Sequence, residues 1–186
     1  MKLIRNISYS KEDWLWYLFN KLGYSELAVC NNYTGTDGEM YFSKWITYNE
    51  LLYLGPSYKK NIIIKRATHR TILDIEIMFD IDDLIMPIGN SKFKFASIEL
   101  KSKFIFQKLK ELGKQPVVYF TGNKSYHISI IIPELRRLSN YQRSNYKEKI
   151  LKKFGGDLMK KSNRCMISME DELHYRSGKP KSRVHW

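Results

Sequence analysis

The chain has 186 residues, of which 43% are hydrophobic and 14% aromatic, which is enough for one domain with a buried core and excludes a disordered chain. Its 32 Lys and Arg residues outnumber its 19 Asp and Glu residues, for a formal net charge of +13. Fourteen basic and five acidic residues lie between Arg136 and Trp186, so the C-terminal third carries most of the excess. Such a surface favours a polyanionic partner, nucleic acid ahead of a membrane, and the alternative is a lysine face that only aids solubility.

The start of the chain, Met1-Lys-Leu-Ile-Arg-Asn-Ile, has no secretory hydrophobic region, and the apolar run from Trp14 to Phe19 is too short to span a bilayer. We therefore expect a soluble, cytoplasmic protein with no membrane partner. The two cysteines, Cys30 and Cys165, are too few for a four-ligand zinc site, so no zinc is expected. Both are expected to be ordinary buried thiols.

The first 66 residues predict one helix followed by short strands. Ser10 is a suitable N-cap for a helix that runs to Leu22 and stops at Gly23. Strands are then expected, with turn-forming residues over 31–38, at Leu27–Cys30, Met40–Ile46 and Asn61–Arg66. Aromatic side chains are dense here, and core packing is favoured over base stacking for most of them: Tyr33, Tyr41, Phe42, Trp45, Tyr48, Tyr53 and Tyr58.

The stretch from Ile75 to Asp83, IEIMFDIDD, predicts a strand with two different faces. With a period of two residues, its isoleucines and Phe79 point to one side, which is expected to enter the core. The other side is expected to be acidic and consists of Asp74, Glu76, Met78, Asp80 and Asp82. Because neighbouring carboxylates repel each other, an acidic face favours a bound cation.

Asp80 and Asp82 are the candidate metal ligands. They lie two residues apart near the end of the strand, and carboxylate oxygens suit hard divalent ions such as Mg²⁺ or Mn²⁺. A half-exposed strand that runs into a turn explains the same residues without a metal. Arg66, His69 and Arg70 precede the strand, close enough in sequence for a basic side chain to reach a phosphate held over the two aspartates.

Two further helices and a hairpin are expected downstream. After a break at 87–90, apolar residues from Phe93 to Leu112 have helical spacing. The strand-like runs 116–120 and 126–132 predict a hairpin, and a lysine-rich helix follows from Asn140 to Phe154. Short strands are expected at Cys165–Ile167, Leu173–Tyr175 and Lys181–His185. This order predicts an α+β fold with a mixed or antiparallel sheet and flanking helices.

The hairpin carries a second group of polar side chains. Alternation places Ser125, His127 and Ser129 on one side of its second strand. The turn before that strand supplies Thr121, a glycine and Lys124, which together make a cradle for phosphate oxygens. A single histidine in a strand is usually structural, so His127 gains meaning only in combination with the aspartates.

Together, FDID at the end of one strand and TGNKSYHI in a following hairpin resemble the archaeo-eukaryotic primase superfamily, whose catalytic core pairs a D-x-D strand with an S-G-x-x-G-x-H hairpin. The resemblance covers about Arg70 to Pro180 and implies an RRM-like core. It also implies that Asp80 and Asp82 hold the catalytic metals. The nucleotide's triphosphate would then be bound by Thr121, Lys124, Ser125 and His127.

A later part of the chain extends this resemblance. The family places a third carboxylate after a helix, followed by an S-L-H-x-K-T-G-like segment whose histidine contacts phosphate. The sequences Phe154-Gly-Gly-Asp157 and LHYRSGKP over 173–180 look like these two features. Asp157 is thus the expected third metal ligand, with Glu170 or Asp171 in reserve, and otherwise it is a solvated turn aspartate. The expected nucleotide-binding residues here are His174, Arg176 and Lys179.

The chain departs from the family pattern just before His174. Where the family has a basic residue and a Pro-Gly turn, this sequence reads ISMEDEL over 167–173. These added acids weaken the assignment of His174 to the triphosphate, and Arg164, Arg176 or Lys179 are the candidates to compensate. The zinc module of replicative primases is not found in the sequence.

The resemblance implies one catalytic domain over 1–186, with an N-terminal α/β part over 1–65 and the core over 66–186. We expect a DNA-dependent primase or primase-polymerase that joins NTPs or dNTPs on a single-stranded DNA template, with two Mg²⁺ or Mn²⁺ ions. The expected template contacts are Arg70, Lys152, Lys153, Lys160 and Arg164. A helicase or other replication or primase subunits are candidate partners, and the small form suits a plasmid or a virus by family analogy.

Two alternatives from other classes stay open. A non-catalytic member of the same fold would bind nucleic acid or a primase partner, which the altered segment before His174 favours. A metal nuclease would use the acidic strand for phosphodiester hydrolysis.

Overall fold

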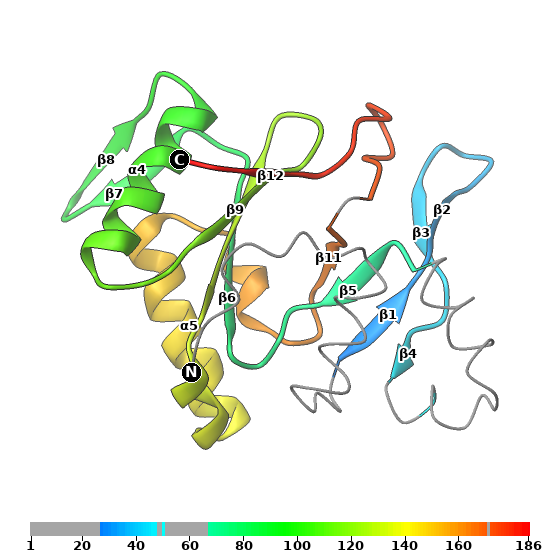
Figure 1. The fold of residues 1–186 in the computed structure, drawn as a ribbon, viewed down its shortest axis with the longest axis horizontal. Helices are drawn as coiled ribbons and strands as arrows, with labels where there is room; N and C mark the ends of the chain where they lie inside the picture. Colours follow the sequence, from blue (N-terminus) through cyan, green and yellow to red (C-terminus); the bar gives the residue numbers. More distant parts are fainter. Residues whose placement is uncertain (1–26, 48–49, 51–66, 171) are drawn as a thin grey trace. The chain divides into compact units, whose positions relative to one another are not determined.

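The computed structural model describes residues 27–47, 50, 67–170 and 172–186 (Figure 1). The chain divides into two compact units, one up to Arg70 and one from Thr71 onward. The expected helix at 11–22 and strand at 61–66 lie outside the described residues, and the single catalytic domain stays a prediction. Among the helices of these ranges, none is long and apolar enough to cross a lipid bilayer.

The first unit is built from short antiparallel strands. Its strands are β1 (Ala28–Cys30), β2 (Asn32–Thr34), β3 (Met40–Phe42), β4 (Ile46–Thr47) and β5, which spans His69–Thr71. β1 pairs with both β4 and β5, and β2 pairs with β3 in a hairpin. The expected strand at 27–30 is confirmed, whereas the one expected at 40–46 is two separate strands, and the turn residues 31–38 include β2.

Several aromatic residues of this unit lie at the surface, which corrects the prediction that most of them pack in a core. Tyr33 is 55% exposed and Trp45 is 37% exposed. Tyr33 and Tyr41 lie opposite each other on β2 and β3 with their rings stacked, and Phe42 packs edge-on against His69. Short paired strands leave one face of such a hairpin open, so its aromatic side chains contact one another instead of a core.

The second unit is centred on a four-stranded antiparallel sheet. Its strands are β6 (Glu76–Ile81), β9 (Val117–Phe120), β10 (Tyr126–Ile131) and β12 (Ser182–Val184), in the order β12-β9-β10-β6. This confirms the FDID strand and the hairpin, and it places the hairpin's second strand directly against β6. The two motifs of the sequence are therefore neighbours in the sheet.

Two α-helices in the described ranges pack on this sheet, α4 (Ile98–Glu111) and α5 (Asn140–Phe154). Ile105 and Leu109 of α4 and Leu151 of α5 are buried, and Phe154 meets Phe79 edge-on with ring centroids 5.8 Å apart. α5 has the predicted bounds because Ser139 forms a capping box with Gln142, and Gly155 ends the helix with a left-handed φ of 63°. The face of the sheet that the two helices cover is thus the predicted core face of β6.

The segment between β6 and α4 differs from the prediction. The helix expected from Phe93 starts only at Ile98, because residues 85–94 form a hairpin of β7 (Ile85–Ile88) and β8 (Ser91–Lys94) that turns at Gly89. Ser97 caps the helix by accepting a hydrogen bond from the Leu100 amide. The aromatic rings that suggested helical spacing pack against each other from strand, loop and helix, namely Phe93, Phe95 and Phe104.

The C-terminal third contributes short elements. The 3₁₀-helix η2 (Pro133–Arg137) precedes α5 in the chain, and the 3₁₀-helix η3 (Leu158–Lys161) follows it. η3 contacts β6. β11 (Met166–Ser168) matches the strand expected at 165–167 to within a residue. The strand expected at 173–175 is wrong, since only a single bridge joins Leu173 to Pro180.

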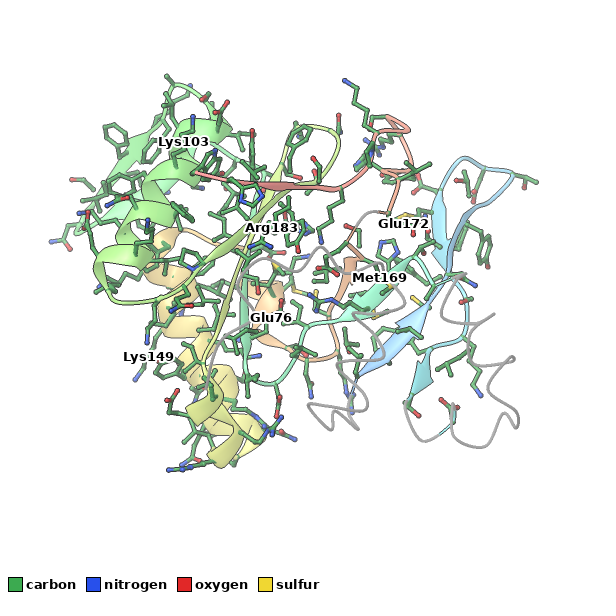
Figure 2. All side chains as sticks on the ribbon, viewed as in Figure 1. Glu76, Lys103, Lys149, Met169, Glu172 and Arg183 are labelled. Atoms are coloured by element: carbon green, nitrogen blue, oxygen red, sulfur yellow. The ribbon has the colours of Figure 1, made fainter. Side chains whose placement is uncertain are left out.

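The second face of β6 is less acidic and more buried than its sequence predicts. Glu76, which Figure 2 labels, and Met78 are each only 1% exposed, and Met78 packs with Ile72 and Ile167. Glu76 accepts hydrogen bonds from the Leu73 amide and from the hydroxyl of Ser129, so its charge serves the fold. The aspartates at the end of the strand are therefore the part of this face that is available for chemistry. Cys30 is buried as expected, but Cys165 is only half-buried.

Candidate active site

Four polar side chains form one row across the sheet of the second unit. Asp80 on β6 lies opposite His127 on β10, and His127 lies opposite Tyr119 on β9. Tyr119 in turn lies opposite Arg183 on β12, which Figure 2 labels. Directly paired residues of antiparallel strands project to the same face, so a carboxylate, an imidazole, a phenol and a guanidinium share one side of the sheet.

Asp80 and His127 are in close contact. The distance between Nε2 of His127 and Oδ1 of Asp80 is 3.6 Å, and their side chains are 8% and 22% exposed, respectively. Burial raises the pKa of Asp80, the charge and hydrogen bond of Lys160 lower it, and the charges of Asp82 and Asp157 raise it again. The net direction is upward, as expected for carboxylates that crowd together in a partly buried place.

Lys160 of η3 provides the cation that this acidic group requires. Its Nζ lies 3.3 Å from Oδ2 of Asp80 and 3.9 Å from Oδ2 of Asp157. Burial lowers the pKa of Lys160, but the charges of Asp80, Cys165 and Asp157 outweigh burial and raise it overall. One ammonium group therefore bridges two of the three predicted metal ligands.

The three aspartates fit a divalent cation in chemistry but are not assembled around one. Asp82 is exposed at the end of β6, and Asp157 caps η3 by accepting a hydrogen bond from the Met159 amide at 2.9 Å. Within the described ranges, no three His, Cys, Asp or Glu side chains are grouped closely enough to hold a metal ion. Carboxylate oxygens at Asp80 and Asp157 suit Mg²⁺ or Mn²⁺, provided that the ammonium of Lys160 moves out from between them.

Lys101 of α4 holds the backbone on both sides of the acidic group. This lysine is 1% exposed, and its Nζ donates hydrogen bonds of 2.7 Å to Oδ1 of Asp83 and to the carbonyl of Ile85. It also donates to the carbonyl of Gly155 at 3.4 Å. Asp83 follows Asp82, and Gly155 lies two residues before Asp157, so one buried ammonium positions both segments that carry these acids.

The turn between β9 and β10 is closed by its own hydroxyl groups. Thr121 is buried, and its Oγ1 lies 3.0 Å from the carbonyl of Ser125 and 2.8 Å from its hydroxyl. Lys124 is exposed at the tip of the turn. The predicted phosphate-binding role of Lys124 is compatible with this position. The same role for Thr121 and Ser125 stays a prediction, because their hydroxyls are already engaged with each other.

The segment around His174 packs on that turn. The hydroxyl of Ser177 donates to the carbonyl of Gly122 at 2.6 Å. Gly122 has a φ of 89°, and a Cβ there would lie 2.4 Å from the carbonyl oxygen of Lys179 and 3.2 Å from Cβ of His174. Two predicted nucleotide-binding elements, distant in sequence, are therefore neighbours at this end of the sheet.

The imidazole of His174 has a defined orientation. Its Nδ1 accepts weak hydrogen bonds from the amides of Arg176 and Ser177 at 3.3 and 3.4 Å, so Nε2 carries the proton of the neutral ring. Burial, and then the charge of Arg176, lower the pKa of His174. Arg176 and Lys179 are exposed on the same loop. His174 is thus suited to act as a neutral donor.

The residues predicted to contact a template differ in accessibility. Arg70 is 2% exposed, so its guanidinium is not at the surface. Lys152 and Lys153 are exposed on the last turn of α5, where Lys152 pairs with Glu148 at 2.6 Å. Arg164 is exposed as well. Lys160 belongs to the acidic group instead of a free basic surface.

In the part of the chain that the structure describes, neither alternative to Asp157 as third metal ligand is supported by a contact with Asp80. Glu170 lies 3.6 Å from Lys181, and Asp171 lies outside the described residues.

Sequence reasoning missed three members of this site. Tyr119 and Arg183 belong to the row with Asp80 and His127, and Lys181 is buried with its Nζ 5.2 Å from the centre of the Tyr119 ring. The signal for Lys181 and Arg183 was their period of two in the last expected strand, which places both on one face. Only the register of β12 against β9 shows that this face is the one that carries Asp80.

Comparison with solved structures shows the class of fold. The polymerase domain of Mycobacterium tuberculosis ligase D, solved in complex with DNA, matches with a TM-score of 0.56 at 11% identity, over 95% of this chain and 81% of that chain. Primase RepB′ matches with a TM-score of 0.50 at 13% identity, over 95% of this chain. The chain spans 56% of the RepB′ chain. No protein family and no curated protein matches the sequence.

The chain thus shares its fold with these two proteins, which confirms the α+β core expected from the sequence motifs. At this level of identity the likeness establishes the architecture. The chemistry must be argued from the residues that this chain places on it.

Proposed function

We propose that the chain is a DNA primase or primase-polymerase, a nucleotidyltransferase that joins NTPs or dNTPs on a single-stranded DNA template. The observation that supports it best is the contact between Asp80 and His127 across β6 and β10, with Asp82 and Asp157 beside it. The two motifs named from the sequence thereby share one end and one face of the sheet. The fold shared with the ligase D polymerase domain and with primase RepB′ adds to the proposal.

Asp80, Asp82 and Asp157 would hold two Mg²⁺ or Mn²⁺ ions, which supply charge neutralisation and lower the pKa of the attacking 3′-hydroxyl. The chain's own groups bind and orient the nucleotide. Lys124 at the turn between β9 and β10 supplies a charged donor for the triphosphate, and Arg176 and Lys179 do so from the neighbouring loop. The neutral His174 offers Nε2–H to a phosphate oxygen.

Two residues that the fold brings into the row extend this set. Arg183 places a guanidinium on the sheet face two strands away from His127, where it would neutralise phosphate charge. Tyr119, between them, offers an aromatic surface and a hydroxyl group. The basic C-terminal third, with Lys152, Lys153 and Arg164, would hold the template mainly through its phosphates, so template binding should weaken steeply with salt.

The test is incorporation of a labelled nucleotide by the full chain on a primed and on an unprimed single-stranded template, with Mn²⁺ or Mg²⁺. Asp80→Asn/Asp82→Asn should lower incorporation by at least about a thousandfold, because both would-be metal ligands lose their charge. Glu99→Gln/Glu111→Gln is the matched control, since it removes two exposed acids from α4 and should keep full activity. Equal incorporation by wild type and Asp80→Asn/Asp82→Asn would contradict the proposal.

A non-catalytic protein of the same fold is the second candidate, and the position of Lys160 favours it. An ammonium between Asp80 and Asp157 neutralises the acidic group without a metal ion. This candidate predicts DNA binding or binding to a primase partner with no incorporation under any metal. Degradation of single strands in the absence of nucleotides would instead identify a metal nuclease.

A further inference from the structure

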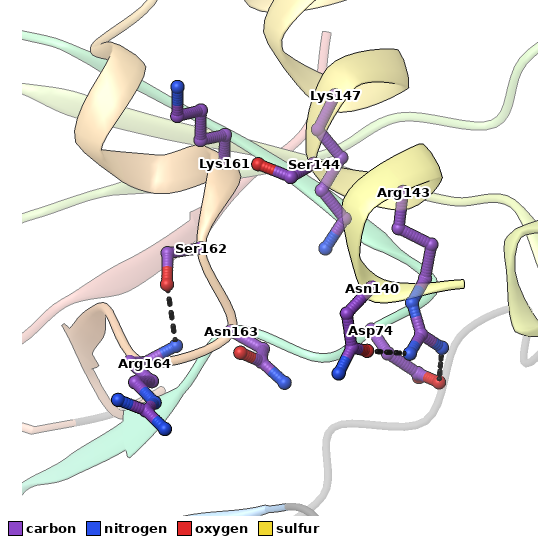
Figure 3. A pocket seen from close by; sticks show the side chains of 9 residues that line it. All are labelled: Asp74, Asn140, Arg143, Ser144, Lys147, Lys161, Ser162, Asn163 and Arg164. Carbon is purple, nitrogen blue, oxygen red and sulfur yellow. Dashed lines mark hydrogen bonds and ion pairs between the residues drawn. The ribbon is translucent and has the colours of Figure 1, made fainter. Parts of the chain in front are cut away.

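A pocket of about 250 Å³ lies at the start of α5 (Figure 3). Its wall is formed by α5, by the end of η3 and the residues that follow it, and by Asp74 just before β6. Asp74 lies in the turn before β6, whereas Asp80 lies near the other end of that strand, so the two aspartates belong to different sites. The described residues that line the pocket carry four basic side chains and one acid.

The four cations reach the pocket from two elements and differ in how far they are engaged. Arg143 is paired with Asp74 at 2.7 Å, and Lys161 is paired with Glu148 at 2.5 Å. Arg164 is exposed, and within the described ranges its guanidinium has no hydrogen bond or ion pair. At least one positive group is therefore available to a ligand without breaking an existing contact.

Lys147 makes the pocket a built site instead of a patch of surface lysines. It is 2% exposed and donates to the carbonyl of Leu73 at 2.8 Å. Burial lowers the pKa of Lys147 to about 8, against the opposing influence of the charges on Glu76 and Asp74. A buried cation is stabilised when an anion comes close, so Lys147 adds to the preference of this basic wall for negative charge.

The start of α5 adds to this preference. The helix has 15 residues and opens at Asn140, which lines the pocket, so its positive dipole end faces the same space. Oδ1 of Asp74 is buried and has no hydrogen-bond partner among the described residues, so a ligand that also carries a hydroxyl group has an acceptor there. Ser144 contributes a hydroxyl at the wall.

We propose that this pocket is a second anion site that binds a phosphate group, separate from the Asp80 group. Among the described residues, Arg164 is its free donor, and Lys161 can contribute if it leaves Glu148. Arg143 and Lys147 form its buried basic wall. The phosphate comes either from a nucleic-acid strand or from a free nucleotide, two sources with the same chemistry. For a nucleic-acid phosphate the proposal rests on the proposed function, because Arg164 is also one of the proposed template contacts. Nucleotide incorporation tests the Asp80 group separately, since the pocket is lined by none of the three aspartates.

The experiment compares full-length variants in two binding measurements. Anisotropy of a labelled single-stranded oligonucleotide reports the strand, and thermal stabilisation by inorganic phosphate and by a nucleoside triphosphate, without metal, reports the free source. Arg164→Gln/Lys161→Gln should weaken the affinity for the oligonucleotide, or the affinity for free phosphate and triphosphate, by roughly tenfold. If the strand is the source, the salt dependence should also flatten by about 0.7 for each phosphate that the variant no longer binds.

The matched control is Lys108→Gln/Lys110→Gln, which removes the same charge from the last turn of α4. A loss of oligonucleotide affinity beyond that of the control identifies the strand, and a loss of stabilisation by phosphate or triphosphate identifies the free nucleotide. Ser144→Asp adds a carboxylate to the same wall and should give the same loss, which keeps the test valid if the double variant does not fold. Unchanged binding in both measurements, or losses equal to those of the control, would overturn the proposal.

Discussion

The two ends of β6 carry the same residue type in opposite surroundings. Asp80, near the end of the strand, lies among other carboxylates with Lys160 as its cation. Asp74, before its start, lies among cations, and one of its oxygens accepts a 2.7 Å hydrogen bond from Arg143. The surplus charge around each aspartate, and not the aspartate itself, decides whether the site favours a cation or an anion.

Glu76 separates these two ends in function as well as in position. It is almost fully buried, and its carboxylate is used by the Leu73 amide and the Ser129 hydroxyl. Glu76 therefore stabilises the fold, whereas Asp74 and Asp80, at the two ends, are placed to interact with ligands. Substitutions at the three places should separate stability from binding.

The largest effect on stability is expected from Glu76→Ala. It leaves the buried Leu73 amide and the half-buried Ser129 hydroxyl without this acceptor and removes a carboxylate that interacts with Lys147, so the free energy of unfolding should fall by about 3–4 kcal/mol. Urea unfolding followed by circular dichroism measures this. Glu76→Gln keeps an acceptor and should cost less, whereas Asp80→Asn should cost little because it relieves carboxylate crowding. A large loss of stability in Asp80→Asn would contradict the inference that Glu76 stabilises the fold and Asp80 does not.

Lys147 gives the basic pocket its own dependence on pH. Its pKa is about 8 in the folded chain against an ordinary value of 10.5, so the unfolded chain binds more protons between these values. The free energy of unfolding contributed by Lys147 should therefore rise as the pH increases from 8 to 10.5, by on the order of 1–3 kcal/mol. The difference between wild type and Lys147→Met in urea unfolding at several pH values measures it. A difference that stays constant across this window would show that Lys147 titrates normally.

The smallest effect is expected at the acidic end. Lys160→Met removes the ammonium that competes with a metal ion for Asp80 and Asp157, so the affinity for Mn²⁺ should rise by roughly fivefold, or about 1 kcal/mol. Calorimetric titration with Mn²⁺ and no nucleotide measures the change. Lys153→Met, on an exposed turn of α5, is the control and should leave the affinity unchanged. Weaker Mn²⁺ binding in Lys160→Met would mean that the lysine organises the acids instead of competing for them.

The fold could be predicted where local chemistry alone defines an element. The capping box at Ser139 and the left-handed Gly155 mark both ends of α5, and period-two alternation marks β6 and β10. The hairpin of β7 and β8 was missed because the spacing of Phe93 and its apolar successors fits a helix equally well. The rings that produced this spacing meet through tertiary contacts, which a periodic pattern does not encode.

The candidate site was predictable in part for a similar reason. Alternation identifies which side chains share a face of one strand, so Asp80 and His127 could be named from the sequence. The register between strands brings in Tyr119 and Arg183. The turn of the hairpin fixes the pairing of β9 with β10, so Tyr119 could have been named, whereas β12 and β9 are distant in sequence and no local signal specifies their register. Lys101, Lys147 and Lys181 look like surface residues in the sequence, yet each is buried because backbone carbonyls accept from its ammonium.

The three hydrogen bonds of Lys101 have a mechanical consequence. Because a single side chain of α4 is tied to the loop after β6 and to the end of α5, a sliding movement of α4 would pull on both loops together. Asp82 and Asp157 would then shift in concert, and the spacing between them would follow the helix. A ligand that binds to the outer surface of α4 would thus change the spacing of these aspartates from a distance, without contacting a nucleotide.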